Sequence, residues 1–172
     1  MGNAPAATGN FPSVVILEAG APDNAPVPTE PVLMDQFGQQ FVPAVIVTRV
    51  GQPVEFRNSE DVAHNVHVFD LDTSLTVVNV ATPVMGSSYR FTFEQTGAYG
   101  VQCDVHPAMA AFIIATSSPY AVVADQDGTF VLPGVPYGAY TLRVWNVDAS
   151  RGSQQPVEIE GVQTEVGLLG RR

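Results

Sequence analysis

Residues 97–115 read "GAYGVQCDVHPAMAAFIIA" and carry the strongest structural and chemical signals in the chain. Two runs rich in β-branched and aromatic residues lie on either side of a short loop, which predicts two neighbouring strands. The loop contains Cys103, which is the single cysteine of the chain, together with His106 and Met109. This stretch therefore predicts a strand pair that gathers three side chains able to bind a soft metal ion.

The rest of the chain has the same short-strand character. Runs of valine, isoleucine, phenylalanine and threonine are separated by 15 glycines and 14 prolines, and no long window keeps an apolar period of 3.6 residues. This pattern indicates an all-β protein built as a sandwich. Strands are predicted at residues 13–18, 39–50, 53–59, 64–70, 88–93, 97–103 and 110–116.

Composition divides the chain into three parts. Residues 1–30 are expected to form a flexible tail, a first strand and a proline-rich linker, and residues 31–118 form the main domain. Residues 119–170 contain further alternating runs joined by hairpin turns, which predicts a second, smaller β unit. This unit is short for a complete sandwich, so the strand at 13–18 joins either this unit or the main sandwich to cover an edge.

Charge and hydropathy exclude two classes of partner. The 172 residues carry a formal net charge of -10, and all seven basic residues are arginines scattered along the sequence. Phosphate binding requires clustered cations, so nucleic acid is not an expected partner. No apolar run reaches the roughly 20 residues of a membrane span, and the first residues lack the basic and apolar regions of a signal peptide.

A further candidate ligand lies upstream, in the predicted strand "HNVHVFD". Side chains alternate between the two faces of a strand, so His64 and Val66 share one face while Asn65 and His67 share the other. We expect His64 to point into the core. His67 is expected at the surface.

Together these donors form a known set. A cysteine thiolate, two imidazoles and a weak axial thioether make up the blue-copper electron-transfer centre. The three loop donors follow one another at intervals of three residues, so a tight loop stiffened by Pro107 can place them around one ion. The predicted cofactor is one copper ion, Cu(I) or Cu(II), and its predicted ligands are His64, Cys103, His106 and Met109.

Other interpretations fit these residues less well. A lone cysteine is usually a small buried hydrophobe, but that interpretation leaves its grouping with the other donors to chance. A cysteine–histidine nucleophile would give Met109 no role, and zinc prefers other ligands to a thioether. Three histidines are too few for a copper enzyme with further copper centres, and one cysteine is too few for a binuclear copper centre.

The motifs resemble a known family. "GAYGVQCDVHPAMAAFIIA" and "HNVHV" resemble the ligand strands of the cupredoxins, and the short loop looks most like that of the amicyanins in the plastocyanin-like branch. This likeness covers about half the chain. Over nearly its whole length the chain resembles bacterial cupredoxin-domain proteins often labelled methylamine utilisation proteins, in which a carboxypeptidase-regulatory-like β segment follows the cupredoxin.

The resemblance implies a Greek-key cupredoxin sandwich with an appended small β-sandwich-like unit. It places the four predicted ligands on the copper ligands of the family, and it implies that Asn65 holds the cysteine loop through hydrogen bonds. Relatives often carry a bulky "DWM" after the second histidine, whereas Pro107 and Ala108 give this chain a smaller surface. Electrons are expected to enter at His106, which Pro107, Ala108 and Ala111 flank.

The function implied is outer-sphere transfer of single electrons, without enzymatic turnover. The expected partner is a redox protein such as a c-type cytochrome or an oxidoreductase, and the expected location is periplasmic or extracellular. The alternative is a copper-carrying or structural subunit of a cell-envelope assembly, for which the second β unit would serve as the docking module.

Overall fold

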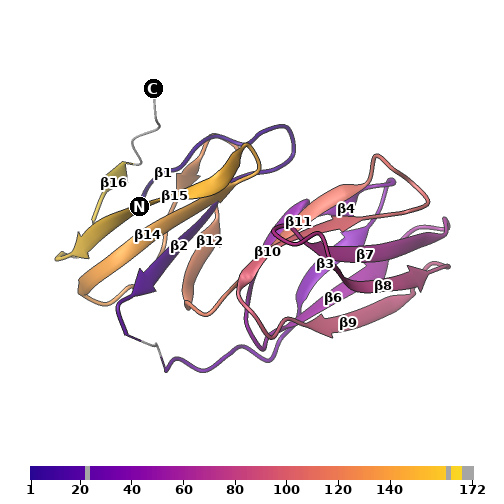
Figure 1. Ribbon diagram of the computed structural model, residues 1–172, viewed down its shortest axis with the longest axis horizontal. Helices are drawn as coiled ribbons and strands as arrows, with labels where there is room; N and C mark the ends of the chain where they lie inside the picture. The colour runs from indigo at the N-terminus through magenta and orange to yellow at the C-terminus, as the bar shows by residue number, and fades with distance from the viewer. Residues whose placement is uncertain (22–23, 162–163, 168–172) are drawn as a thin grey trace. The chain divides into compact units, whose positions relative to one another are not determined.

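The computed structural model describes residues 1–21, 24–161 and 164–167, which form strands, turns and loops. The chain divides into two compact units (Figure 1). Unit 1 comprises residues 1–25 and 118–172, and unit 2 comprises residues 26–117. Within the described residues there is no helix long and apolar enough to cross a membrane.

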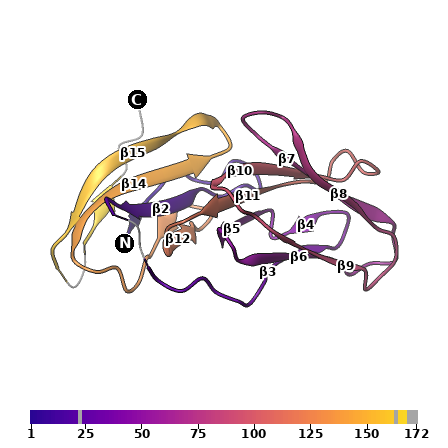
Figure 2. The ribbon, with the colours of Figure 1, turned by 60° about the horizontal axis from the view of Figure 1, so that its bottom comes forward.

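Unit 2 is a sandwich of two sheets, which appear as two layers in Figure 2. One sheet has five strands in the order β5-β11-β10-β7-β8, and the other has four in the order β4-β3-β6-β9. The strands of the first sheet are β5 (Val45–Arg49), β7 (His64–Asp70), β8 (Thr76–Thr82), β10 (Gly97–Gln102) and β11 (Ala110–Thr116). Those of the second are β3 (Val32–Gln36), β4 (Phe41–Val42), β6 (Pro53–Asn58) and β9 (Ser88–Thr92).

The alternation of side chains on β7 follows the sequence prediction. His64, Val66 and Val68 are buried, while the residues between them are only partly buried. Inward-facing residues of both sheets share one apolar core because each strand turns one face toward the other sheet. The largest of its fully buried side chains are Phe56, Phe93, Met34, Met109 and Ile113.

The predicted strand at 39–50 is divided in the structure. β4 ends at Val42 and β5 begins at Val45, with Pro43 between them. Proline has no N–H to donate to a ladder, so pairing cannot continue through it. Strands β3 and β8 were not predicted, because short or weakly alternating runs become strands only through their partners.

Buried polar side chains tie the two sheets together at one end of the sandwich. Asn58, at the end of β6, donates from Nδ2 to the Val62 carbonyl at 2.7 Å and to the Thr82 carbonyl at 2.8 Å. Thr82, at the end of β8, donates to Oε1 of Gln36 at 2.6 Å. The Gln36 amide in turn donates to the Asn65 carbonyl at 3.1 Å. These bonds fix the loop that leads into His64.

Unit 1 also contains two sheets, in the orders β12-β2-β14-β15 and β13-β1-β16. A separate apolar cluster, which includes Val15, Leu17, Leu142 and Val144, forms its core. The strands of the first sheet are β2 (Val14–Ala19), β12 (Tyr120–Val123), β14 (Gly138–Asn146) and β15 (Ala149–Ile159). Those of the second are β1 (Gly2–Asn3), β13 (Thr129–Phe130) and β16 (Val166–Gly167).

The N-terminal segment is an integral part of unit 1. β2 pairs with both β12 and β14, so the first predicted strand lies inside this sheet. The segment before β2 was expected to be a flexible tail. In the structure, Gly2 and Asn3 of this segment pair with β13 and β16. Local composition gave no sign of this, since the pairing partners lie more than a hundred residues away. Ser13 adds a side-chain link by accepting a hydrogen bond from Asn146 at 2.9 Å.

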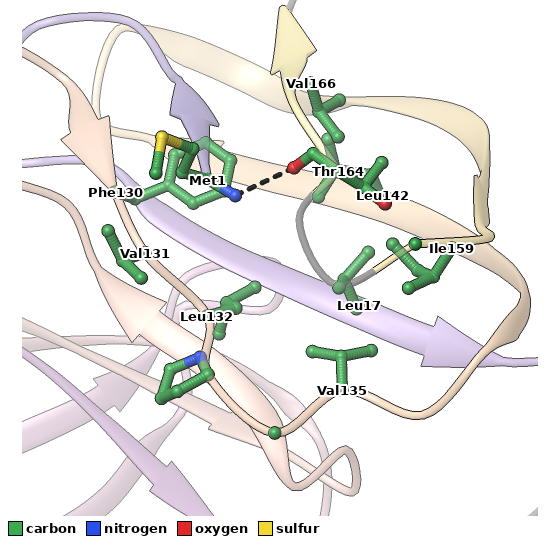
Figure 3. Close-up of a pocket in the computed structure, with 13 residues that line it drawn as sticks. Met1, Leu17, Phe130, Val131, Leu132, Val135, Leu142, Ile159, Thr164 and Val166 are labelled. Atoms are coloured by element: carbon green, nitrogen blue, oxygen red, sulfur yellow. Dashed lines mark hydrogen bonds between the residues drawn. The ribbon is translucent and has the colours of Figure 1, made fainter.

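Unit 1 contains a cavity of about 280 Å³ (Figure 3). Leu17, Phe130, Leu142 and Ile159 line it, together with the loop at 131–135. The lining is mostly apolar, and its polar groups include the N-terminal ammonium of Met1, which donates to the Thr164 carbonyl at 2.9 Å.

Replacement of Asn58 tests the polar link between the sheets. Asn58→Ala leaves the buried Thr82 carbonyl and the partly buried Val62 carbonyl without their donor, and an unmade buried hydrogen bond costs about 1–3 kcal/mol. We expect the free energy of unfolding of unit 2 to fall by about 2–3 kcal/mol, measured by denaturant titration. The control is Gln95→Ala, because Gln95 is exposed and uses its backbone carbonyl to accept from Tyr99. Equal effects of the two substitutions would contradict this role of Asn58.

Candidate metal centre

Two neighbouring strands of unit 2 bring the predicted donors together. His64 is the first residue of β7, and Cys103 directly follows β10. These strands pair antiparallel with Gln102 opposite His67, so the start of β7 lies beside the end of β10. The loop then carries His106 before the chain enters β11.

Three donor atoms converge at this point. Sγ of Cys103 lies 3.8 Å from Nδ1 of His64 and 3.6 Å from Nδ1 of His106. The two Nδ1 atoms are 3.0 Å apart. Among the described residues, these three form the one group of histidine, cysteine or carboxylate side chains whose ligand atoms could hold a metal ion.

The donor set fits a copper ion. Metal bonds of about 2.0–2.3 Å to nitrogen and sulfur place neighbouring donors roughly 3–4 Å apart, which is the separation observed here. Cys103 and His64 are 1 % and 2 % exposed, so water has little access to them. A buried thiolate needs compensating positive charge, and a metal ion between the three donors would provide it. Thiolate and imidazole together are suited to copper.

Backbone hydrogen bonds of Met109 close the loop that begins at Cys103. The Met109 N–H donates to the His106 carbonyl at 2.9 Å, and the Cys103 N–H donates to the Met109 carbonyl at 3.3 Å. Met109 is buried in the same core cluster as Cys103. The fourth predicted ligand is therefore in the same closed loop as the cysteine and the second histidine.

Asn65 connects β7 to the residue after the cysteine. Its Oδ1 accepts from the Asp104 N–H at 2.7 Å, and its Nδ2 donates to Oδ2 of Asp104 at 2.9 Å. Such bonds to the cysteine loop are those that the family resemblance implies for Asn65. The sequence did not single out Asp104, because its role depends on partners from other strands.

Asp104 and His67 form a polar network on the outer face of the sheet. Nδ1 of His67 lies 2.9 Å from Oδ1 of Asp104, and Asn79 also donates to this carboxylate at 2.9 Å. Hydrogen bonds from His67, and then from Asn79 and Gln102, hold the pKa of Asp104 far below its usual value. His67 points away from the three donors, as its position on the strand predicts.

Glu60 is a neighbour of the site that sequence reasoning missed. Its Oε1 lies 2.8 Å from Nε2 of His64, on the side of the ring away from Cys103. A hydrogen bond from the Gln39 backbone N–H is the main cause of the lowered pKa of Glu60; partial burial opposes it, and the bond from His64 reinforces it. The available signal was a glutamate four residues before His64, but only the folded loop shows which atom it reaches.

The surface around His106 is apolar, but it is not formed by all the residues that were predicted. His106 is partly exposed, and Pro107 and Ala108 are exposed beside it. Ala111 was expected here and is instead 1 % exposed, because it lies on β11 and faces the core. The exposed large apolar side chains in the turns at this end of the unit are Phe37, Val84, Met85 and Val105.

Comparison with known proteins points to copper binding. Residues 32–116 match the family model described as copper binding proteins of the plastocyanin/azurin family. No curated protein matches the chain.

Several solved structures resemble the chain. A purple cupredoxin from Nitrosopumilus maritimus is 18 % identical with a TM-score of 0.41, over 49 % of this chain and 99 % of that one. Amicyanin from Paracoccus versutus is 22 % identical with a TM-score of 0.45, over 59 % and 96 %. A copper-containing nitrite reductase from Thermus scotoductus is 29 % identical with a TM-score of 0.42, over 58 % of this chain and only 25 % of that one.

The family match and the donor cluster agree in position. His64, Cys103 and His106 all lie inside the matched segment, and the all-β sandwich of unit 2 is the fold of this family. The segment 32–116 belongs to the plastocyanin/azurin family of copper-binding proteins, and the additional β sheets of unit 1 accompany it.

Proposed function

We propose that unit 2 binds one type 1 copper ion and carries single electrons between redox proteins. The observation that carries this proposal is the convergence of Nδ1 of His64, Sγ of Cys103 and Nδ1 of His106 within 3.0–3.8 Å. Met109 would supply the weak axial thioether of such a centre. When bound, copper supplies a one-electron couple between Cu(I) and Cu(II).

The protein scaffold suits this task because it fixes the donors before the metal binds. His64 starts a strand paired on both sides, and the buried Asn58 holds the loop before it. Asn65 holds the residue after Cys103. A site whose ligands are fixed in this way changes little in geometry between two oxidation states, and a small rearrangement favours rapid outer-sphere transfer.

His106 is the proposed point where electrons enter. It is the partly exposed member of the three donors, whereas His64 and Cys103 are buried. Exposed apolar side chains, which include Phe37 at 62 % and Val105 at 60 % exposure, lie in neighbouring turns. A small apolar surface of this kind suits a brief, weak encounter with another protein.

The proposed partner is a redox protein such as a c-type cytochrome or an oxidoreductase. The net charge of -10 favours partners with a basic face, since opposite charges accelerate encounter. The resemblance to exported cupredoxin-domain proteins supports a periplasmic or extracellular location. In this role the chain is an electron carrier and performs no catalysis of its own.

One observation favours a second candidate function. Unit 1 has its own apolar core and its own two sheets, so it could act as a docking module of a copper-carrying or structural subunit in the cell envelope. That role requires reversible release of copper and no electron exchange with redox proteins.

The copper site is tested by visible absorption after addition of Cu(II). We expect an intense thiolate-to-copper charge-transfer band that a mild reductant bleaches. Cys103→Ser removes the thiolate and should abolish the band, and His106→Gln should weaken or shift it strongly. His67→Gln is the matched control, because His67 lies outside the donor group, and it should keep the band. Absence of the band in copper-loaded wild-type protein would refute the proposed centre.

The docking surface is tested by a charge placed beside His106. Val105→Asp should slow electron self-exchange by about tenfold or more, because two like charges then meet at the contact between the two molecules. A tenfold change corresponds to a repulsion of about 1.4 kcal/mol. The rate is measured from NMR line widths in mixtures of oxidised and reduced protein. Leu75→Asp is the control, since Leu75 is 68 % exposed and lies beyond the opposite end of β7. Equal slowing by both substitutions would contradict this surface.

A further inference from the structure

The His64 ring has a different partner on each nitrogen. Nδ1 faces Cys103 and His106, while Nε2 lies 2.8 Å from Oε1 of Glu60. The His64 side chain is fully buried and that of Glu60 is 16 % exposed. A carboxylate can only accept, so Nε2 carries the proton and Nδ1 presents its lone pair to the other donors.

The turn between β3 and β4 holds the Glu60 carboxylate in place. The Gln39 N–H donates to Oε1 at 2.8 Å, and the Gly38 N–H donates to Oε2 at 3.2 Å. Phe37 and Gln40 close this turn with two backbone hydrogen bonds of 3.0 and 3.2 Å.

The backbone of the turn explains why both N–H groups meet one carboxylate. Gly38 and Gln39 have φ values of 63° and 53°, which is the left-handed conformation required at both central residues of a type I′ turn. Successive N–H groups in such turns form a concave site for an anion. A non-glycine residue at positive φ is uncommon, so Gln39 maintains a costly conformation at the place where it contacts Glu60.

Glu60 is also fixed from its own backbone. Its N–H donates to Oδ1 of Asn58 at 3.0 Å, and Asn58 is fully buried. The turn at 37–40 therefore holds the carboxylate of Glu60, and Asn58 at the end of β6 holds its backbone. A side chain anchored in this way keeps one position relative to the His64 ring without depending on that ring.

We propose that Glu60, held by the turn at 37–40, is the positioning residue of His64 and makes the centre favour Cu(II) over Cu(I). This inference rests on the proposed copper function. A hydrogen bond from Nε2–H to a carboxylate fixes the ring orientation and makes the opposite nitrogen a stronger donor. A stronger donor with a negative charge behind it stabilises the more highly charged ion.

The test compares Glu60→Gln with Asp61→Asn. Both substitutions remove one negative charge, but Asp61 is exposed and adjacent in sequence, so it controls for charge alone. In Glu60→Gln we expect the preference for Cu(II) over Cu(I) to fall about tenfold, which raises the reduction potential by about 59 mV for one electron. Asp61→Asn should shift it much less, because solvent screens an exposed charge.

A spectroscopic measurement separates positioning from general stability. In the diamagnetic Cu(I) protein, the Nε2–H proton of His64 should give a low-field NMR resonance that moves upfield in Glu60→Gln and stays in Asp61→Asn. Should Glu60→Gln fail to fold, Glu60→Asp keeps the charge but shortens the side chain, and it must then raise the potential relative to wild type.

The outcomes distinguish this inference from the proposed function. Wild-type protein without a thiolate-to-copper band overturns both. If wild-type protein shows the band but Glu60→Gln and Asp61→Asn have equal potentials, only the role of Glu60 is overturned. An unchanged potential in the fallback variant Glu60→Asp has the same consequence.

Discussion

The pairing of β7 with β10 is the constraint on which the site depends. Because Gln102 lies opposite His67, the first residue of β7 and the residue after β10 meet at one end of the sheet. A shift of this register by one residue would turn His64 to the outer face and His67 inward. The valines that follow His64 on the same face are buried, so the apolar core that fixes the register also fixes the ligand.

The end of the sandwich that carries the donors is polar in its interior. Gln36, Asn58 and Thr82 are buried there and hydrogen-bonded to one another or to nearby carbonyls. Buried polar groups are stable only when their partners are present, so this arrangement permits few alternative positions for the loops. The donors are thus supported by a rigid polar layer on one side and by the apolar core on the other.

Unit 1 is assembled from both ends of the described chain. β2 pairs with β14 across more than a hundred residues, and unit 2 is inserted between them. Contacts between segments so distant in sequence cost chain entropy to form. The long paired strands and the separate apolar core of unit 1 offset this cost. In sequence, the segment that carries the three donor residues is therefore an insertion between the two parts of unit 1.

Local sequence patterns alone determined the facing of the first histidine and the identity of the donor cluster. Alternation along "HNVHVFD" placed His64 inward, and the cluster of Cys103, His106 and Met109 predicted a soft-metal site, because both signals act over a few residues. The tertiary structure alone decided where the N-terminal strand pairs, that Ala111 faces the core, and that Glu60 reaches Nε2 of His64. These features depend on contacts between segments distant in sequence, or on the path of a loop, and local residue patterns carry no information about either.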